Sequence, residues 1–396
     1  MIEWFGFLVS IIILLVGSRF HLGLSLFVGG VVLGLFTISP SEVLNQVYLT
    51  FTEPSIVVLA LALSMIPIIA GLLQESGGLD RIVENLRIGK RGFLGLSPAL
   101  LGLLPIPGGA LFSAPLIDRA GVNLRNHVKA GINIWFRHIL FFIYPLAPAL
   151  IIPASIAGIS VYTVILYQFP FFLLLIGIGY LFLLRNAEGD MGYDSVFSLK
   201  DLAPPLAVIL VAPILNFGLQ NFFQFGIREI STFFAILGSL LLALYLSDFR
   251  GDILEKSIRK TEPWNFVLII FGIFTFINIF ESSGIGSMIS TLSPSRMLLS
   301  IGFGFFLGLV TGRISLPASI IIPIFLTTFS FESLPPLVFA MIYFSIFMGY
   351  VITPIHPCVG LSLEYFDSEI GSFLKVMVLP VGLSMAVVSF VFFLLI

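Results

Sequence analysis

Long uncharged apolar runs constrain this chain more than any other feature. Runs of about 20 residues, the length at which a helix crosses a hydrocarbon core of about 30 Å, recur throughout the sequence. Only 10% of the 396 residues are charged and 58% are hydrophobic, whereas a soluble domain carries about 25% charged residues. Too little polar material remains to cover a water-facing surface. The sequence therefore predicts an all-α polytopic membrane protein that lies in a lipid bilayer.

Composition also excludes several classes of site and partner. The net charge is −2 and no basic stripe is present, so a nucleic-acid partner is not expected. The chain has one cysteine, Cys358, which permits no intramolecular disulfide and no cysteine-based metal cluster. No nucleotide-binding loop is present, which argues against primary ATP-driven transport. We expect no cofactor, no metal site and no catalytic residues.

Ten full spans and two broken stretches are predicted. The spans cover 3–18, 20–38, 54–73, 127–157 (interrupted), 160–184, 204–221, 229–247, 264–281, 335–363 (interrupted) and 371–395. The stretches 93–118 and 297–326 are broken at 105–109 and 311–317. Each of their arms has about 12 residues and rises about 18 Å, which is shorter than the core. Each stretch is either one kinked span or a re-entrant hairpin.

The distribution of basic residues favours hairpins. With both stretches re-entrant, fourteen Lys and Arg fall on one side of the membrane, against Arg228 and Arg296 on the other. The fourteen are Arg19, Arg81, Arg87, Lys90, Arg91, Arg119, Arg125, Lys129, Arg185, Lys200, Arg250, Lys256, Arg259 and Lys260. The positive-inside rule then predicts cytoplasmic basic loops, an inner-membrane location and both termini outside.

The two halves of the chain repeat each other. The matching anchors are Thr52-Glu53-Pro54 with Thr261-Glu262-Pro263, Glu75-Ser76-Gly77-Gly78 with Glu281-Ser282-Ser283-Gly284, Gly102-Leu103 with Gly308-Leu309, Tyr144 with Tyr350, and Pro148 with Pro354. We divide the chain into repeats at 1–190 and 191–396, each with five spans and a hairpin. An odd number of spans forces the second repeat into the membrane upside down, and inverted repeats with broken helices are typical of transporters.

These motifs also resemble a known family. The run Pro105-Ile106-Pro107-Gly108-Gly109-Ala110-Leu111-Phe112-Ser113-Ala114-Pro115 is similar to an uncharacterised prokaryotic integral membrane family of the ion transporter superfamily. That superfamily includes gluconate permeases, dicarboxylate transporters and TRAP large subunits, and Glu75-Ser76-Gly77-Gly78 resembles a stretch of the gluconate permeases. The resemblance implies a homodimer with a scaffold and a moving transport domain that works as an elevator. The Ser-Asn-Thr tips of sodium-coupled dicarboxylate members are absent, which places sodium coupling in doubt.

Arg313 is the most specific candidate residue. An arginine inside an apolar stretch costs about 2.5–3.5 kcal/mol on insertion scales unless it is paired or hydrated. At a hairpin tip its guanidinium would face a cavity and bind a carboxylate through two parallel hydrogen bonds. The alternative is a structural pair with a buried acid or carbonyl. We predict that Arg313 binds substrate.

His356, Arg137 and His138 are the candidates for proton or ion coupling. His356 lies in the break Thr353-Pro354-Ile355-His356-Pro357, where two prolines free backbone carbonyls. It either carries the coupling proton or is a neutral histidine bonded to those carbonyls. Arg137 and His138 lie near the break of the first interrupted helix. The preferred interpretation of Arg137 is that it snorkels towards the cytoplasmic headgroups, and Asn133 belongs with this group.

Residues around the breaks complete the predicted site. The predicted substrate-binding residues, apart from Arg313, are Gly108, Gly109, Ser113, Thr311, Gly312, Ser315, Tyr144, Pro148 and Thr353. The glycines permit tight tips, and the hydroxyls can bind a ligand or return to their own helix, as Ser319 also can.

The sequence therefore predicts a secondary active transporter for a small organic anion, a carboxylate or sugar acid, coupled to protons in preference to sodium. One alternative is an intramembrane enzyme such as a hydrolase or protease, although the apolar spans contain no paired acids. Another is a scaffold subunit that does not transport, which leaves the two breaks without a purpose.

Overall fold

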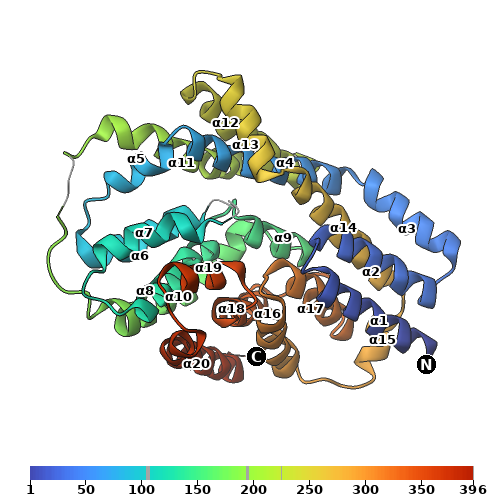
Figure 1. Cartoon of the computed structure of the whole chain (residues 1–396). Coiled ribbons are helices and arrows are strands. Elements are labelled where there is room, and N and C mark those ends of the chain that lie inside the picture. The colour runs from blue at the N-terminus through green and yellow to red at the C-terminus, as the bar shows by residue number, and fades with distance from the viewer. Residues whose placement is uncertain (104–107, 193–195, 224, 396) are drawn as a thin grey trace.

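The computed structural model describes the chain apart from residues 104–107, 193–195, 224 and 396, and its described residues form helices and no strands (Figure 1). The first half contains α1 (Ile2–Gly17), α2 (Leu22–Thr37), α3 (Pro40–Thr52), α4 (Pro54–Glu75), α5 (Gly78–Glu84), α6 (Gly89–Gly102), α7 (Ala110–Ala120), α8 (Asn126–Arg137), η1 (Ile139–Phe142), α9 (Pro148–Ile156), α10 (Val161–Gly179) and η2 (Tyr180–Leu184). The second half contains α11 (Leu199–Phe222), α12 (Arg228–Leu246), α13 (Gly251–Thr261), α14 (Trp264–Ser282), α15 (Ile285–Ser290), η3 (Leu298–Gly302), α16 (Phe303–Thr311), α17 (Ser315–Thr328), α18 (Pro336–Ile352), α19 (Pro357–Tyr365) and α20 (Ile370–Leu395).

Seven helices in the described residues are long and apolar enough to cross a membrane, which confirms a multi-pass membrane protein. They are Pro54–Glu75, Val161–Leu184, Leu199–Phe222, Arg228–Leu246, Gly251–Ser282, Pro336–Tyr365 and Ile370–Leu395. The other three predicted spans, 3–18, 20–38 and the interrupted 127–157, are not among these seven. The helices α1 and α2 have 16 residues each, so each rises only about 24 Å. The stretch 127–157 forms separate helices, and ten spans remain a prediction.

The same order of elements occurs in both halves. A long helix (α4 or α14) is followed by a short one (α5 or α15), a pair of short helices, an interrupted helix and a final long helix. Gly77 and Gly284 separate the first two elements in each half with φ of 71° and 72°. This left-handed conformation is strained for residues with a Cβ, so a glycine at both positions ends the long helix in the same way.

The long helices pack across the two halves. In Figure 1, α1, α2 and α14 lie together at the end that holds the N-terminus, and α2 packs directly on α14. In the corresponding contact, α4 of the first half packs on α12 of the second. Gly23 allows the close approach of α2 and α14, because a Cβ there would lie 2.4 Å from the carbonyl carbon of Leu268. We call α1–α4 and α11–α14 the scaffold helices.

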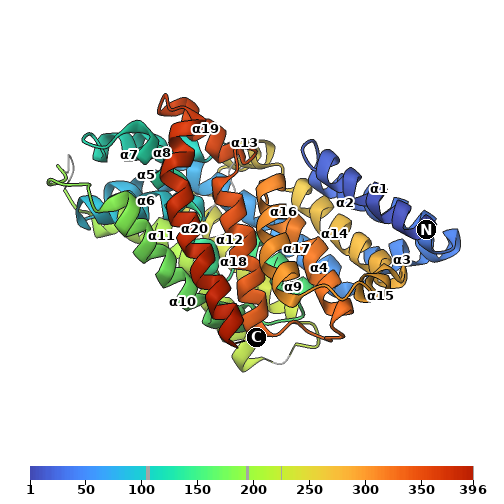
Figure 2. The same ribbon diagram turned by 90° about the horizontal axis from the view of Figure 1, so that it is seen from below.

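The helices α6–α9 and α16–α19 form a second group, which we call the hairpin unit. In it α6 packs on α7 and α8, and α16 packs on α17 and α18. Gly102 and Gly308 bring the backbones together, since a Cβ on either would overlap the main-chain oxygen of Arg137 or Ile346. The halves also cross here: α9 packs on α17, and α19 packs on α7. Figure 2 shows α20 lying beside α18 along one face of this unit.

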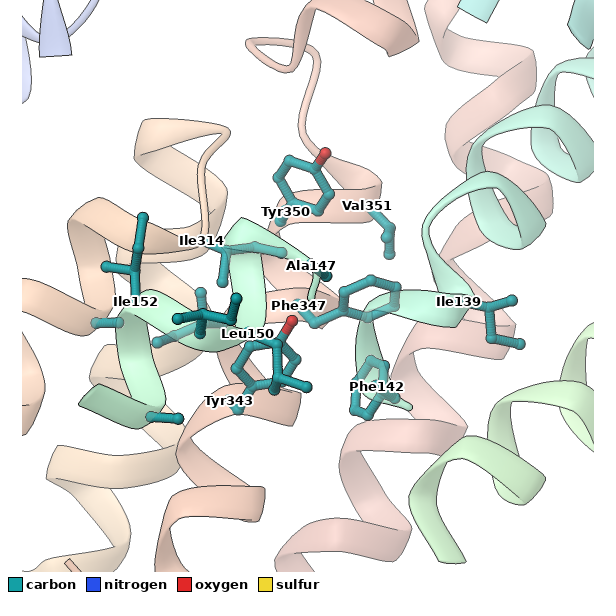
Figure 3. Packing of buried hydrophobic residues seen from close by; sticks show 14 of the residues in the cluster. Ile139, Phe142, Ala147, Leu150, Ile152, Ile314, Tyr343, Phe347, Tyr350 and Val351 are labelled. Carbon is teal, nitrogen blue, oxygen red and sulfur yellow. The ribbon is translucent and has the colours of Figure 1, made fainter. Parts of the chain in front are cut away.

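Aromatic side chains fill the centre of the hairpin unit beside the first break. Phe142 lies edge-on to Phe347 with ring centroids 4.8 Å apart and to Tyr343 at 5.2 Å. Leu150 and Ala147 complete the contact from the start of α9 (Figure 3). All five side chains are almost fully buried. These close-packed rings therefore hold the first break against α18.

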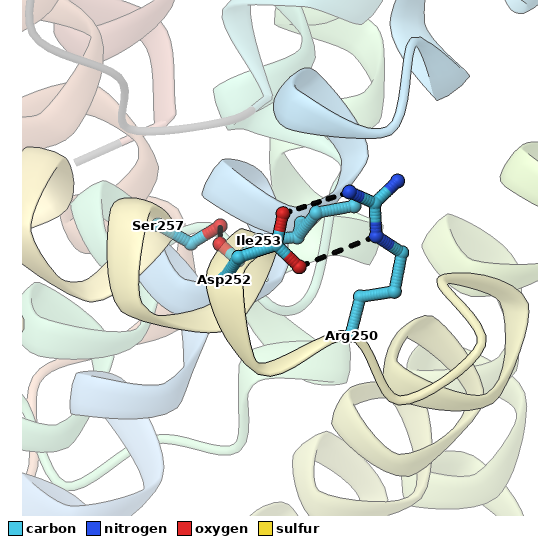
Figure 4. Close-up of polar contacts among 4 residues, drawn as sticks. All are labelled: Arg250, Asp252, Ile253 and Ser257. Atoms are coloured by element: carbon cyan, nitrogen blue, oxygen red, sulfur yellow. Dashed lines mark hydrogen bonds and ion pairs between the residues drawn. The ribbon is translucent and has the colours of Figure 1, made fainter.

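Ion pairs lie near both ends of the short helix α13. The helix α13 follows a corner at which the Arg250 guanidinium pairs with the Asp252 carboxylate at 2.8 Å (Figure 4). Lys260, near the other end of α13, pairs with Glu75 of α4 at 3.0 Å. Exposed pairs of this kind contribute about 0–1 kcal/mol each. Of the two, only the Lys260–Glu75 pair joins α13 to α4, and neither contributes much to the stability of the fold.

Candidate functional site

A cavity of about 590 Å³ lies between the scaffold helices and the hairpin unit. Its wall is formed by the turn between α1 and α2 (Arg19, Leu22), by α14 (Phe266, Ile269), by the start of α9 (Pro148, Ala149), by the tip 311–315 between α16 and α17, and by Tyr350 and His356 at the break between α18 and α19. The breaks of both interrupted helices, after α8 and after α18, therefore contribute to one cavity together with the tip 311–315.

The tip between α16 and α17 presents Arg313 to this cavity. Gly312 ends α16 with φ of 60°, and a Cβ there would lie 2.9 Å from the backbone nitrogen of His356. Only glycine satisfies both conditions, so the tip contacts the second break directly. The Arg313 amide donates to Thr311 Oγ1 at 3.3 Å, and its guanidinium Nη2 donates to the Ser18 carbonyl oxygen at 2.9 Å. Among the described residues the guanidinium makes no other hydrogen bond, which leaves its remaining hydrogens for a ligand.

Three short helices begin at the cavity wall. They are α9, which begins at Pro148, α17, which begins at Ser315, and α19, which begins at Pro357. The first N–H groups of a helix have no partner within it, and the helix dipole gives this end a partial positive charge. The three helices therefore add to the positive potential from Arg313.

The charges on the cavity wall have one sign. Arg19 and Arg313 line it, and none of the described lining residues is Asp or Glu. In the described part of the chain, neither arginine forms an ion pair with a carboxylate. A cavity with two unpaired guanidinium groups and three helix N-termini attracts anions and repels cations.

Three aromatic rings form a cluster at the cavity, and two of them, Tyr350 and His356, line it. The centroids of Tyr350 and His356 are 4.0 Å apart, and those of His356 and His138 are 4.9 Å apart. The His138 Nδ1 lies 3.1 Å from the Ile134 carbonyl oxygen, which fits a neutral ring that donates to it. The Nδ1 atom of His356 is buried and has no hydrogen-bond partner among the described residues. An unsatisfied buried nitrogen is rare and marks a group that a proton, water or ligand can engage.

Arg137 is buried inside the protein and does not line the cavity. Its side chain is buried, and its guanidinium donates to Ser113 Oγ at 3.1 Å and to the Leu101 carbonyl oxygen at 3.2 Å. Asn133 extends the network, because its amide nitrogen donates to the Ala110 carbonyl oxygen and lies 2.9 Å from Ser362 Oγ. The snorkelling interpretation of Arg137 is therefore wrong: the guanidinium is bonded inside the fold and does not reach the surface.

One group of side chains has the composition of a metal site. A nitrogen of His138, a nitrogen of His356 and the Cys358 sulfur lie within 4.8 Å of one another. The guanidinium of Arg137 lies beside Cys358 and interacts with it. A bound divalent cation would therefore face a buried positive charge that no carboxylate of the described residues compensates. This charge opposes metal binding.

The structure brings only part of the predicted site together. Thr311, Gly312, Arg313, Ser315, Pro148 and His356 line the cavity. Gly108, Gly109, Ser113, Tyr144, Thr353, Arg137 and His138 do not line it. The Tyr144 hydroxyl donates instead to the Ile209 carbonyl oxygen at 2.9 Å, and Ser319 returns to its own helix. Residues 105–107 of the predicted first tip lie outside the described residues.

Arg19 and Tyr350 are lining residues that the sequence did not identify as site residues. Tyr350 carried a usable signal, because it is the repeat partner of Tyr144 and precedes the second break. Arg19 carried none, because a basic residue in a short loop between two spans has the ordinary explanation of a cytoplasmic charge.

Comparisons with known proteins agree with this architecture. Residues 4–396 match the family model described as "Protein of unknown function (DUF401)". A comparison with curated proteins found no match. The crystal structure of the Alcanivorax borkumensis YdaH transporter has a TM-score of 0.62 with 14% identity, over 98% of this chain and 97% of that chain. At this level of identity the likeness shows a shared fold.

Proposed function

We propose that this chain, which belongs to the DUF401 family over residues 4–396, is a secondary transporter that moves a small organic anion across the cytoplasmic membrane. A carboxylate or a sugar acid has the required charge and size. The fold shared with the YdaH transporter supports a transport role. The resemblance of the sequence around Pro105–Pro115 to the ion transporter superfamily points the same way.

The cavity at Arg313 is the observation that carries this proposal. It contains cationic groups and helix N-termini but no described carboxylate, and it lies where the tip between α16 and α17 meets the break before α19. Irregular backbone at membrane depth is tolerated only where protein buries it or a watery cavity adjoins it. A guanidinium at such a site binds a carboxylate through charge-assisted hydrogen bonds.

Inverted repeats give this site a mechanism for alternating access. The equivalent element order in both halves and the crossed pairs α9–α17 and α7–α19 support repeats at 1–190 and 191–396. Two units related in this way can exchange their conformations, which moves the opening of a central site from one side of the membrane to the other. Because the cavity lies between the scaffold helices and the hairpin unit, we propose that the hairpin unit moves as an elevator. We further propose a homodimer with cytoplasmic basic loops and external termini.

His356 supplies the coupling site in this proposal. His356 lines the cavity, and its buried Nδ1 has no hydrogen-bond partner among the described residues, so a proton taken up there would interact electrostatically with an anion in the cavity. Uptake driven by a proton gradient should lose that dependence in His356→Gln, while a sodium gradient should have little effect on the native protein. Unchanged proton coupling in this variant would remove His356 from the mechanism.

The first test is a thermal-shift screen of the purified protein against carboxylates, sugar acids and inorganic oxyanions. A ligand at 100 times its dissociation constant should stabilise the fold by about 2.7 kcal/mol. The stabilisation should disappear in Arg313→Gln, and the native protein in liposomes should accumulate the same anion. Failure of every anion with a folded protein, or equal stabilisation of the variant, would overturn the proposal.

A further inference from the structure

We propose that the anion bound in this cavity carries two separated negative groups, one held by Arg313 and the other by Arg19. The inference rests on the proposed function and deepens it by naming the charge pattern of the substrate. It also assigns Arg19, in a loop between two helices, as a residue that determines specificity.

Arg19 and Arg313 line the same cavity from two different structural units. Arg313 belongs to the tip of the hairpin unit, whereas Arg19 belongs to the turn between scaffold helices α1 and α2. The units meet at this point, because Arg313 Nη2 donates to the carbonyl oxygen of Ser18, the residue before Arg19. Arg19 is exposed, so a change of rotamer can bring its guanidinium to a ligand in the cavity.

The balance of charge favours a dianion over a monoanion. One carboxylate on Arg313 would leave the positive charge of Arg19 without a counterion, since no described lining residue is acidic. Like charges that share a partly enclosed cavity repel each other, and a second anionic group removes that repulsion. The N-termini of α9, α17 and α19 add further positive potential to the same wall.

The two arginines differ in burial, so we expect them to contribute differently to anion binding. Arg313 is partly buried and held by the Ser18 carbonyl, so its position is set before a ligand arrives. Arg19 has no such restraint among the described residues, and it would be ordered by the second anionic group. Loss of Arg313 should therefore weaken every anion, whereas loss of Arg19 should weaken only anions that reach both residues. A simple role of Arg19 in binding lipid headgroups predicts no such selectivity.

Matched pairs of anions test this inference. The purified full-length protein would be titrated with malonate and propionate, succinate and butyrate, glutarate and valerate, and adipate and hexanoate, with thermal stability and calorimetry as readouts. In at least one pair the dianion should bind about tenfold more tightly or better. Arg19→Gln should reduce that preference to near unity without weakening the monoanion, and Arg19→Lys should restore part of it. Arg125→Gln, which removes an exposed arginine outside the cavity, is the matched control and should change nothing.

The outcomes separate this inference from the proposed function. Equal binding within all four pairs, with binding lost in Arg313→Gln, would overturn the dianion and leave the anion transporter intact. A dianion preference that persists unchanged in Arg19→Gln would overturn the assignment of Arg19. If no anion of either charge binds the folded native protein and Arg313→Gln behaves like it, both proposals fail together.

Discussion

The two halves of the hairpin unit have the same backbone plan but use their polar residues differently. In the first half, Ser113, Asn133 and Arg137 bond to one another and to main-chain carbonyls, and none of them lines the cavity. In the second half, Arg313 and Ser315 line the cavity, and the nearby His356 has a free Nδ1. A shared fold therefore carries a closed polar network on one side and an open one on the other.

This difference separates two meanings of a buried polar residue in a membrane protein. A closed network offsets the cost of desolvation within the fold, so its residues hold helices together. An open set of donors is satisfied only when a ligand or water is present, so its residues recognise that ligand. The predictions below should show stability effects in the first half and binding effects in the second.

The largest effect should come from a position at which the halves are alike. Gly102→Ala places a Cβ on the backbone oxygen of Arg137, and the backbones of α6 and α8 must separate to relieve the overlap. Overpacking of this kind should destabilise the protein by about 3 kcal/mol. The melting temperature in detergent is the measurement. Gly218→Ala is the control, because no atom lies within 4 Å of its Cβ position. A native-like melting temperature in Gly102→Ala would show that this backbone contact is not required.

The closed network should give the next largest effect. Asn133 is fully buried and bonds to Ser113, to Ser362 and to the Ala110 carbonyl oxygen. Its replacement by alanine leaves these partners unsatisfied, which should destabilise the fold by about 2 kcal/mol. The affinity for the anion found in the thermal-shift screen should stay unchanged, because Asn133 lies outside the cavity wall. Weakened binding with native stability would mean that the first network also contacts substrate.

The sequence predicted more of the backbone than of the site. Apolar runs, the recurrence of Glu75, Gly102, Tyr144 and Pro148 206 residues later in the chain, and the paired glycines Gly102 and Gly308 are local signals, and they predicted the helices and the points at which the interrupted helices break. Arg313 and His356 were identifiable because a charged or titratable residue beside a helix break in an apolar stretch is costly to keep. Arg19 and the inward direction of Arg137 depend on which surfaces meet in three dimensions. The spacing of residues along the sequence does not show which surfaces meet.

The smallest effects should come from two serines, one in each half, and they should differ in kind: one on binding and one on stability. Ser315 begins α17 at the cavity wall, whereas Ser113 lies in α7 and donates to Asn133 Oδ1 at 2.6 Å. Loss of one neutral hydrogen bond costs about 1 kcal/mol, which is about a fivefold change in a binding constant. Ser315→Ala should therefore weaken the anion about fivefold at native stability, and Ser113→Ala should lower the melting temperature at native affinity. Each variant removes one serine hydroxyl from a short helix. The anion affinities and melting temperatures of the two variants can therefore be compared directly. If both variants affected only stability, the polar residues of the second half would also be satisfied within the fold, and the assignment of the cavity as the substrate site would be wrong.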